Sequence, residues 1–166
     1  MKTQFVATLS KDSFGKIAKQ VQLYKQRYKT GIQLGVEEAT KRCYEIICKM
    51  MNQYNLSSHI SNVKWEYNSK MHVGKVYTTD IVIIFHEFGT GAKGTQDEWA
   101  NAFGYKVNQS GKGDKGWNFY NENRKYGGIT HGLTSKHIFY QAMLTIQKQL
   151  SETVNVYVSK TVGAMY

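Results

Sequence analysis

Proline is absent from the 166-residue chain, so its helices need not stop at a residue that breaks their hydrogen bonding. Turns must then come from glycine, asparagine and aspartate, and fifteen glycines are present. Long apolar runs are also missing, because the longest, Ile81–Phe85, is far shorter than the ~20 residues that span a bilayer. The first ten residues contain no apolar segment typical of a secretory signal. We therefore expect a single domain over residues 1–166, with no membrane contact.

Cysteine is scarce, with Cys43 and Cys48 lying five positions apart in a helical pattern. On a helix, side chains five positions apart point about 140° away from each other, so these two cannot form a local disulfide. A zinc site would need a second ligand pair, such as a further CxxC, and none is visible. We expect both thiols to be reduced, in a cytoplasmic setting, and to pack as small apolar side chains.

Recognisable catalytic motifs are missing too. His86 and Glu87 begin like a zinc-hydrolase helix, but Thr90 stands where the second histidine belongs. The glycine-rich segment 89–95 follows an apolar segment as a phosphate-binding loop would, yet its Lys93 precedes a glycine instead of following it. No nucleophile elbow or carboxylate pair stands out. We expect no enzyme activity, no catalytic or metal-binding residues, and no cofactor.

Acidic residues are few beside basic ones, with 12 against 22 and a net charge of +10. Such an excess can serve nucleic acid, an acidic protein partner or solubility. A small DNA-binding protein that uses its N-terminal helix therefore remains an alternative. The candidate basic surface consists of Lys16, Lys19, Lys25, Arg27 and Lys29.

What the sequence does contain is a long helical pattern. Apolar residues recur every three or four positions over roughly 13–53, which predicts one amphipathic helix capped by Asp12 or Ser13. A helix of this length exceeds what one small core can cover. Part of its apolar stripe therefore needs a second surface, and a neighbouring subunit is one candidate.

The period changes after residue 55. Alternation of apolar and polar residues over 63–67 predicts a strand, residues 68–70 predict a turn, and residues 73–77 predict a weaker strand. The segment 80–88 is the most apolar and predicts a third, central strand. Short connections favour antiparallel pairing.

Glycine then becomes frequent, which predicts a long flexible loop over about 89–116. Inside this loop, Thr95 and Glu98 form a T-x-x-E capping box, and Gly104 is placed to end a helix. A short helix over about 96–103 is therefore expected.

The remaining chain predicts a short strand over 117–120, a turn at Gly127–Gly128 and a helix that starts near Ser135 and ends near residue 150. Alternating valines then predict an extended tail over 152–166 that can pair with a sheet edge. The whole pattern predicts an α+β fold, in which a long N-terminal helix and a C-terminal helix pack on a small, mainly antiparallel sheet.

Several short motifs occur in a familiar order. The apolar segment ends in E-F-G-T-G at 87–91, Gly116-Trp117 follows the loop, and His131-Gly132-Leu133 precedes a helix that carries Phe139 and Ala142-Met143. In this order and spacing, the chain from about 13 to 150 resembles the minor tail-component family of long-tailed bacteriophages, the head-to-tail joining or tail-completion proteins.

The resemblance implies a structural virion protein at the phage neck that acts by ring assembly and is made in the bacterial host cytoplasm. Its implied partners are copies of itself in a six-fold ring, neck or connector proteins, tail-tube or terminator proteins, and DNA in the lumen as a non-specific contact. The purified protein can still be a monomer, and a tail terminator of similar design is a second alternative. The candidate interface residues are Phe88, Gly89, Thr90, Trp99, Phe103 and Trp117.

Overall fold

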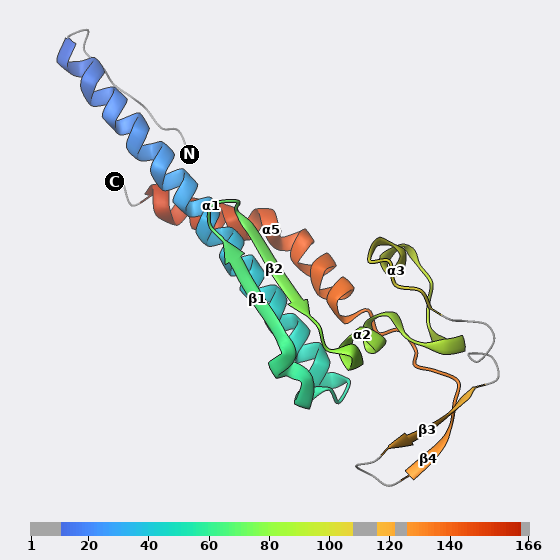
Figure 1. The fold of residues 1–166 in the computed structure, drawn as a ribbon. Helices are drawn as coiled ribbons and strands as arrows, with labels where there is room; N and C mark the ends of the chain where they lie inside the picture. Colours follow the sequence, from blue (N-terminus) through green and yellow to red (C-terminus); the bar gives the residue numbers. More distant parts are fainter. Residues whose placement is uncertain (1–10, 108–115, 122–125, 164–166) are drawn as a thin grey trace.

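The computed structural model describes residues 11–107, 116–121 and 126–163, and it confirms the α+β class. Two long helices, α1 (Lys11–Gln53) and α5 (Ile138–Gly163), lie side by side, and the hairpin of β1 (Val63–Asn68) and β2 (Val73–Thr78) covers α1 (Figure 1). The short elements are η1 (Ser57–Asn62), α2 (Ile81–Phe88), η2 (Gly91–Lys93), α3 (Glu98–Ala102), β3 (Trp117–Asn121) and β4 (Tyr126–Thr130).

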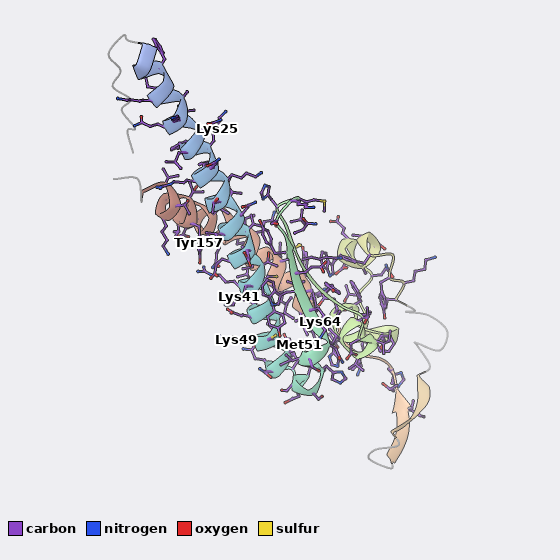
Figure 2. All side chains as sticks on the ribbon, turned by 60° about the vertical axis from the view of Figure 1, so that its left-hand side comes forward. Lys25, Lys41, Lys49, Met51, Lys64 and Tyr157 are labelled. Atoms are coloured by element: carbon purple, nitrogen blue, oxygen red, sulfur yellow. The ribbon has the colours of Figure 1, made fainter. Side chains whose placement is uncertain are left out.

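The two long helices cross antiparallel at two glycines of α1. A Cβ atom on Gly31 would lie 2.6 Å from the Cα of Val158, and one on Gly35 would lie 2.7 Å from the Cα of Val154. Side chains cannot approach a backbone so closely, so only glycine lets α5 come this near. From Gly31 toward its N-terminus, α1 projects past the end of α5 (Figure 1), and Figure 2 shows Lys25 on this projecting part.

The core lies at the other end of α1, under the hairpin. It brings together α1, the η1–β1 junction, α2 and the start of α5, through Ile47, Met51, Leu56, Val63, Ile83, Ile138 and Ala142. The strands of the hairpin pair antiparallel, with Trp65 opposite Val76. It lies directly on α1 at Gly74, because a Cβ there would overlap the hydroxyl of Thr40. The predicted first two strands are therefore confirmed.

The third predicted strand, over 80–88, is wrong, because this segment is the helix α2. Asp80 caps α2, since its Oδ1 accepts the backbone N–H of Val82 at 2.8 Å. Hydrogen bonds from His59 at 2.7 Å and Asn62 at 2.6 Å hold the same carboxylate and, with the Val82 N–H, lower its pKa to about 2. Gly89, with φ of +74°, then ends the helix. The five apolar residues of Ile81–Phe85 fit a buried strand or a buried helix, and the cap at Asp80 decides for the helix.

The extended tail predicted over 152–166 is also wrong, because α5 continues to Gly163; residues 164–166 lie outside the described chain. Val154 and Val158 pack against the glycines of α1, and this tertiary contact outweighs the strand preference of β-branched residues. The helix also begins at Ile138, three residues later than expected.

The segment predicted as a glycine-rich loop contains η2 and α3, and its residues 108–115 lie outside the described chain. The cap of α3 is Asp97, whose side chain accepts the N–H of Ala100, and not Thr95. Gly104 ends this helix with φ of +66°, as expected. The strand predicted at 117–120 is confirmed as β3, but Gly127 and Gly128 lie within β4 instead of forming a turn.

Because Gly35 lies at the helix crossing and Gly15 does not, we expect opposite effects when each is replaced by alanine. Gly35→Ala would force α1 and α5 apart and lower the free energy of unfolding by about 1–3 kcal/mol. Gly15→Ala is the matched control, because nothing lies within 4 Å of a Cβ at that position. The control would raise the free energy of unfolding by up to about 1 kcal/mol. Urea titration followed by circular dichroism measures both, and equal effects would contradict the crossing.

Candidate functional site

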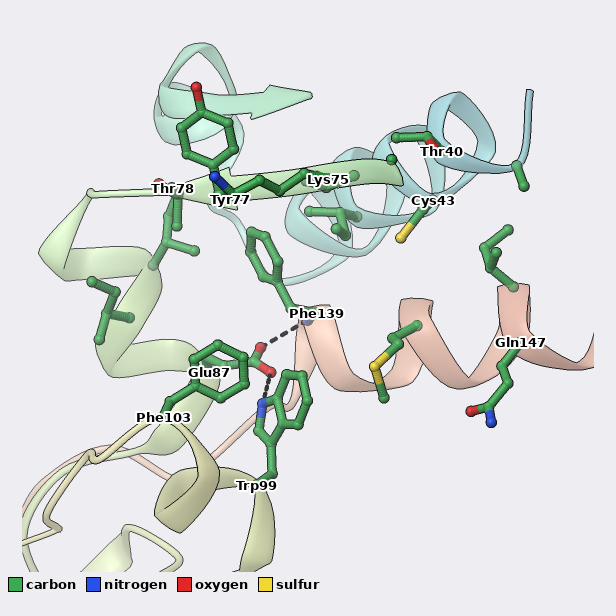
Figure 3. A pocket seen from close by; sticks show the side chains of 18 of the residues that line it. Thr40, Cys43, Lys75, Tyr77, Thr78, Glu87, Trp99, Phe103, Phe139 and Gln147 are labelled. Carbon is green, nitrogen blue, oxygen red and sulfur yellow. Dashed lines mark hydrogen bonds between the residues drawn. The ribbon is translucent and has the colours of Figure 1, made fainter. Parts of the chain in front are cut away.

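An apolar groove of about 990 Å³ lies between β2 and α5, with α1 as its floor and α2 and α3 at one end (Figure 3). Its lining includes Val36, Cys43, Val76, Met143, Ile146 and Leu150. Met143 and Leu150 each keep 39% of their surface exposed. An open apolar surface of this kind is typical of a site that another molecule covers.

Few polar groups interrupt the groove. Thr40 directs its hydroxyl to the carbonyl of Val36 on its own helix, at 2.8 Å. The thiol of Cys43 points from α1 into the groove (Figure 3), and burial raises its pKa, which keeps it neutral and weakly nucleophilic. The groove therefore suits apolar contact and offers no obvious reactive group.

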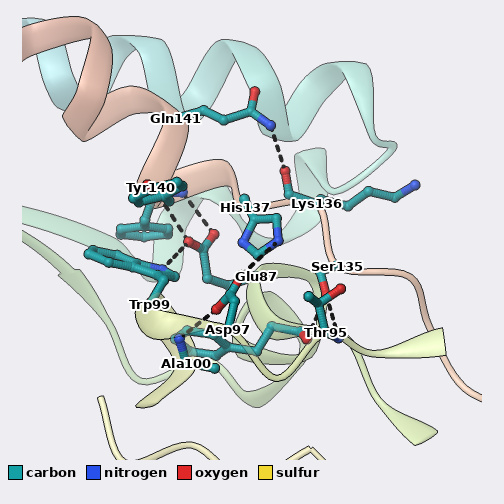
Figure 4. A network of polar contacts seen from close by, with 12 residues as sticks. Glu87, Thr95, Asp97, Trp99, Ala100, Ser135, Lys136, His137, Tyr140 and Gln141 are labelled. Carbon is teal, nitrogen blue, oxygen red and sulfur yellow. Dashed lines mark hydrogen bonds and ion pairs between the residues drawn. The ribbon is translucent and has the colours of Figure 1, made fainter. Parts of the chain in front are cut away.

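Glu87 of α2 lines the groove and is only 4% exposed. Its Oε1 accepts hydrogen bonds from Trp99 Nε1 at 2.8 Å and from the backbone N–H of Tyr140 at 3.0 Å, and its Oε2 accepts from the N–H of Phe139 at 2.8 Å (Figure 4). The carboxylate thus satisfies the free N–H groups at the start of α5 and places a negative charge at the positive end of that helix.

Two of the segments on which the family resemblance depends, 87–91 and 131–133, lie against each other where α2 meets the chain before α5, a region that we call the junction. Thr90 and Leu133 exchange backbone hydrogen bonds of 2.9 and 3.1 Å. Gly132 has φ of +109°, and a Cβ there would overlap the carbonyl of Thr90. Ser135 donates to the carbonyl of Phe88 at 2.7 Å. The E-F-G-T-G and H-G-L motifs therefore join α2 to the start of α5.

Two of the six candidate interface residues, Phe88 and Gly89, are buried within the chain. The Phe88 ring stacks on Tyr105, with centroids 4.7 Å apart. The half-buried Thr90 and Trp99 are held by the hydrogen bonds already described. These four residues therefore hold the junction between α2 and the start of α5 together.

Phe103 differs from them, since it is 64% exposed. It also lines the groove, and its ring centroid lies 4.6 Å from that of Trp99. Trp117 lies in β3, opposite Thr130 of β4, in a hairpin separate from the junction. The structure thus brings five of the six residues together, and Phe103 is the most accessible of these five.

The candidate basic surface lies wholly on the projecting part of α1. Its four lysines, Lys16, Lys19, Lys25 and Lys29, are exposed, and Arg27 is half-buried. Within the described residues, no group of three or more His, Cys, Asp and Glu side chains is placed to hold a metal ion. No helix in that part of the chain is long and apolar enough to cross a bilayer.

The groove and the role of Glu87 were missed from the sequence. Glu87 lies 52 and 53 positions from the N–H groups that it accepts, so no local pattern marks it as a cap. One signal for the groove was present in the sequence. The C-terminal helix carries more apolar residues than the core of the chain can bury.

Replacement of Glu87 by glutamine tests the junction. Glu87→Gln would turn an NH₂ group toward a backbone N–H at the start of α5 and remove the charge there. We expect the free energy of unfolding to fall by about 2–4 kcal/mol. Glu98→Gln, an exposed acid in the first turn of α3, is the matched control and should change it by less than about 0.5 kcal/mol. Urea titration measures both, and a neutral Glu87→Gln would refute the capping role.

Comparison with known proteins found no matching family model, no matching curated protein and no matching solved structure. What this chain does must therefore be inferred from its own residues.

Proposed function

We propose that this chain is a structural virion protein of a long-tailed bacteriophage, located at the neck, where it joins head to tail or completes the tail. The observation that carries the proposal is the projecting part of α1. Phe14, Val21 and Tyr28 on this part keep 61%, 39% and 45% of their surface exposed. Apolar side chains on a helix that leaves its own core are stabilised when another chain covers them.

The groove supports the same proposal from the other side of the molecule. Each of its exposed apolar side chains gains on the order of 25 cal/mol per Å² when water is excluded. The protein would thus act through contacts with copies of itself and with neck, connector, tail-tube or terminator proteins, and not by catalysis. Glu87, the buried acid beside the groove, already has its oxygens occupied by three protein donors.

The motif order favours head-to-tail joining or tail completion, and a tail terminator would use the same kind of surfaces. A six-fold ring in the virion, assembled in the host cytoplasm, fits either role. The positive charge on α1 would lie toward the DNA in the lumen or toward an acidic neighbour.

A small DNA-binding protein is the second candidate, because the four lysines on the projecting helix are exposed. At 100° per residue, Lys25 and Lys29 lie about 20–60° beyond one edge of the apolar stripe, Lys19 lies opposite the stripe, and Lys16 and Arg27 lie about 60–80° beyond the other edge. The five cations thus spread over about 200° of the helix surface instead of forming one compact patch that faces a single DNA groove, whereas the apolar side chains share one face. We therefore propose assembly with other chains ahead of DNA binding.

Assembly with virion neighbours tests the proposal. The protein would be co-expressed with the neck and tail proteins encoded by the adjacent genes, and mass would be measured by light scattering and shape by negative-stain electron microscopy. We expect rings that contain several copies of this chain. A chain that stays monomeric with every neighbour, yet binds DNA with an affinity that falls steeply with salt, would contradict assembly and favour the second candidate.

A further inference from the structure

The projecting part of α1 carries a regular apolar stripe, which we call the free stripe, formed by Phe14, Ile17, Val21, Tyr24 and Tyr28. Its members are spaced by three, four, three and four residues, which is the spacing of a coiled-coil seam. At 100° per residue they lie within an arc of about 80°, and Gly31 and Gly35 lie on or next to the same arc. The free stripe therefore continues the face with which α1 already contacts α5.

The groove presents a matching line of apolar residues on α5. Phe139, Met143, Ile146 and Leu150 are spaced by four, three and four residues and line the groove (Figure 3 shows Phe139 between Glu87 and Tyr77). This line is about 17 Å long, and the free stripe is about 21 Å long, at 1.5 Å per residue. Two helices with such seams pack side by side at a shallow angle.

The free stripe cannot fill the groove of its own chain. The free stripe lies on α1, and α1 also supplies the groove floor through Val36, Cys43 and Ile47. The helix is continuous from Lys11 to Gln53. A helix cannot fold back on itself without a break. A contact between the two surfaces must therefore join two copies of the chain.

On the basis of the proposed ring function, we propose that the free stripe of one copy docks into the groove of the next. The cations on both edges of the stripe would stay in water while their alkyl stems cover the rim. Such a contact is head-to-tail, because each copy offers a stripe to one neighbour and a groove to the other. Repetition of one head-to-tail contact closes into a ring when the rotation between copies permits it.

Cross-linking between the two surfaces tests this contact. Val21→Cys places a thiol at the centre of the free stripe, native Cys43 supplies one in the groove, and Cys48→Ala removes the other cysteine. The assembly and the concentrated purified protein would each be treated with a short bis-maleimide and separated by denaturing electrophoresis. We expect a ladder of dimers, trimers and higher species, since each copy carries both partners.

Two variants serve as controls. Gln26→Cys lies about 140° around α1 from Val21 and is exposed, so it should give no ladder. Adding Cys43→Ser to Val21→Cys should abolish the ladder. Dimers that persist without Cys43 would mean that two stripes pair with each other, and they would overturn the inference. The absence of a ladder in both samples would overturn it too.

The outcomes separate this inference from the proposed function. Rings with virion neighbours that give no Val21–Cys43 ladder would refute the stripe-in-groove contact and leave the neck function standing. A ladder from protein that forms no complex with any virion neighbour would support the contact and contradict the neck function.

Discussion

The structure depends on the close approach of two helices that are far apart in the sequence. Gly31 and Gly35 allow the backbone of α5 to lie directly on α1, and the Glu87 carboxylate holds the other end of α5 by its first N–H groups. The two constraints act at opposite ends of one helix. Together they place α5 along α1 in a defined register, and the positions of the other surfaces follow from that register.

Two apolar surfaces result from this placement. Because α5 ends near Gly31, the preceding turns of α1 extend beyond the core and expose their apolar side chains. Because α5 and β2 lie on different sides of α1, a groove remains between them. The two surfaces lie at different ends of one continuous helix, one projecting and one concave. Exposed apolar surfaces of this kind are stabilised when another chain covers them, and this is the physical reason for proposing a role in assembly.

The parts of the fold that depend on local pattern were predictable. The period of α1, the β1–β2 hairpin and the stop at Gly104 follow from residues close together in the sequence. The apolar run that forms α2 was misassigned, because periodicity cannot separate a short buried helix from a strand, and Asp80 as its cap was the neglected signal. The C-terminal valines were misassigned because their helix depends on glycines more than a hundred residues earlier. The site was least predictable: Phe88 and Gly89 have structural roles, and Glu87 acts on groups 52 and 53 positions away.

The central claim is that the projecting part of α1 is a surface made for another chain. Hydrogen exchange of its amides, measured in the isolated protein and in the assembled state, tests that claim most directly. In the isolated protein, residues 14–28 should exchange much faster than residues 36–51 of the same helix, because nothing comparable to the core packs on them. On assembly, protection should rise over 14–28 and over the groove segment 143–150. Unchanged exchange over 14–28 in the assembled state would contradict the account.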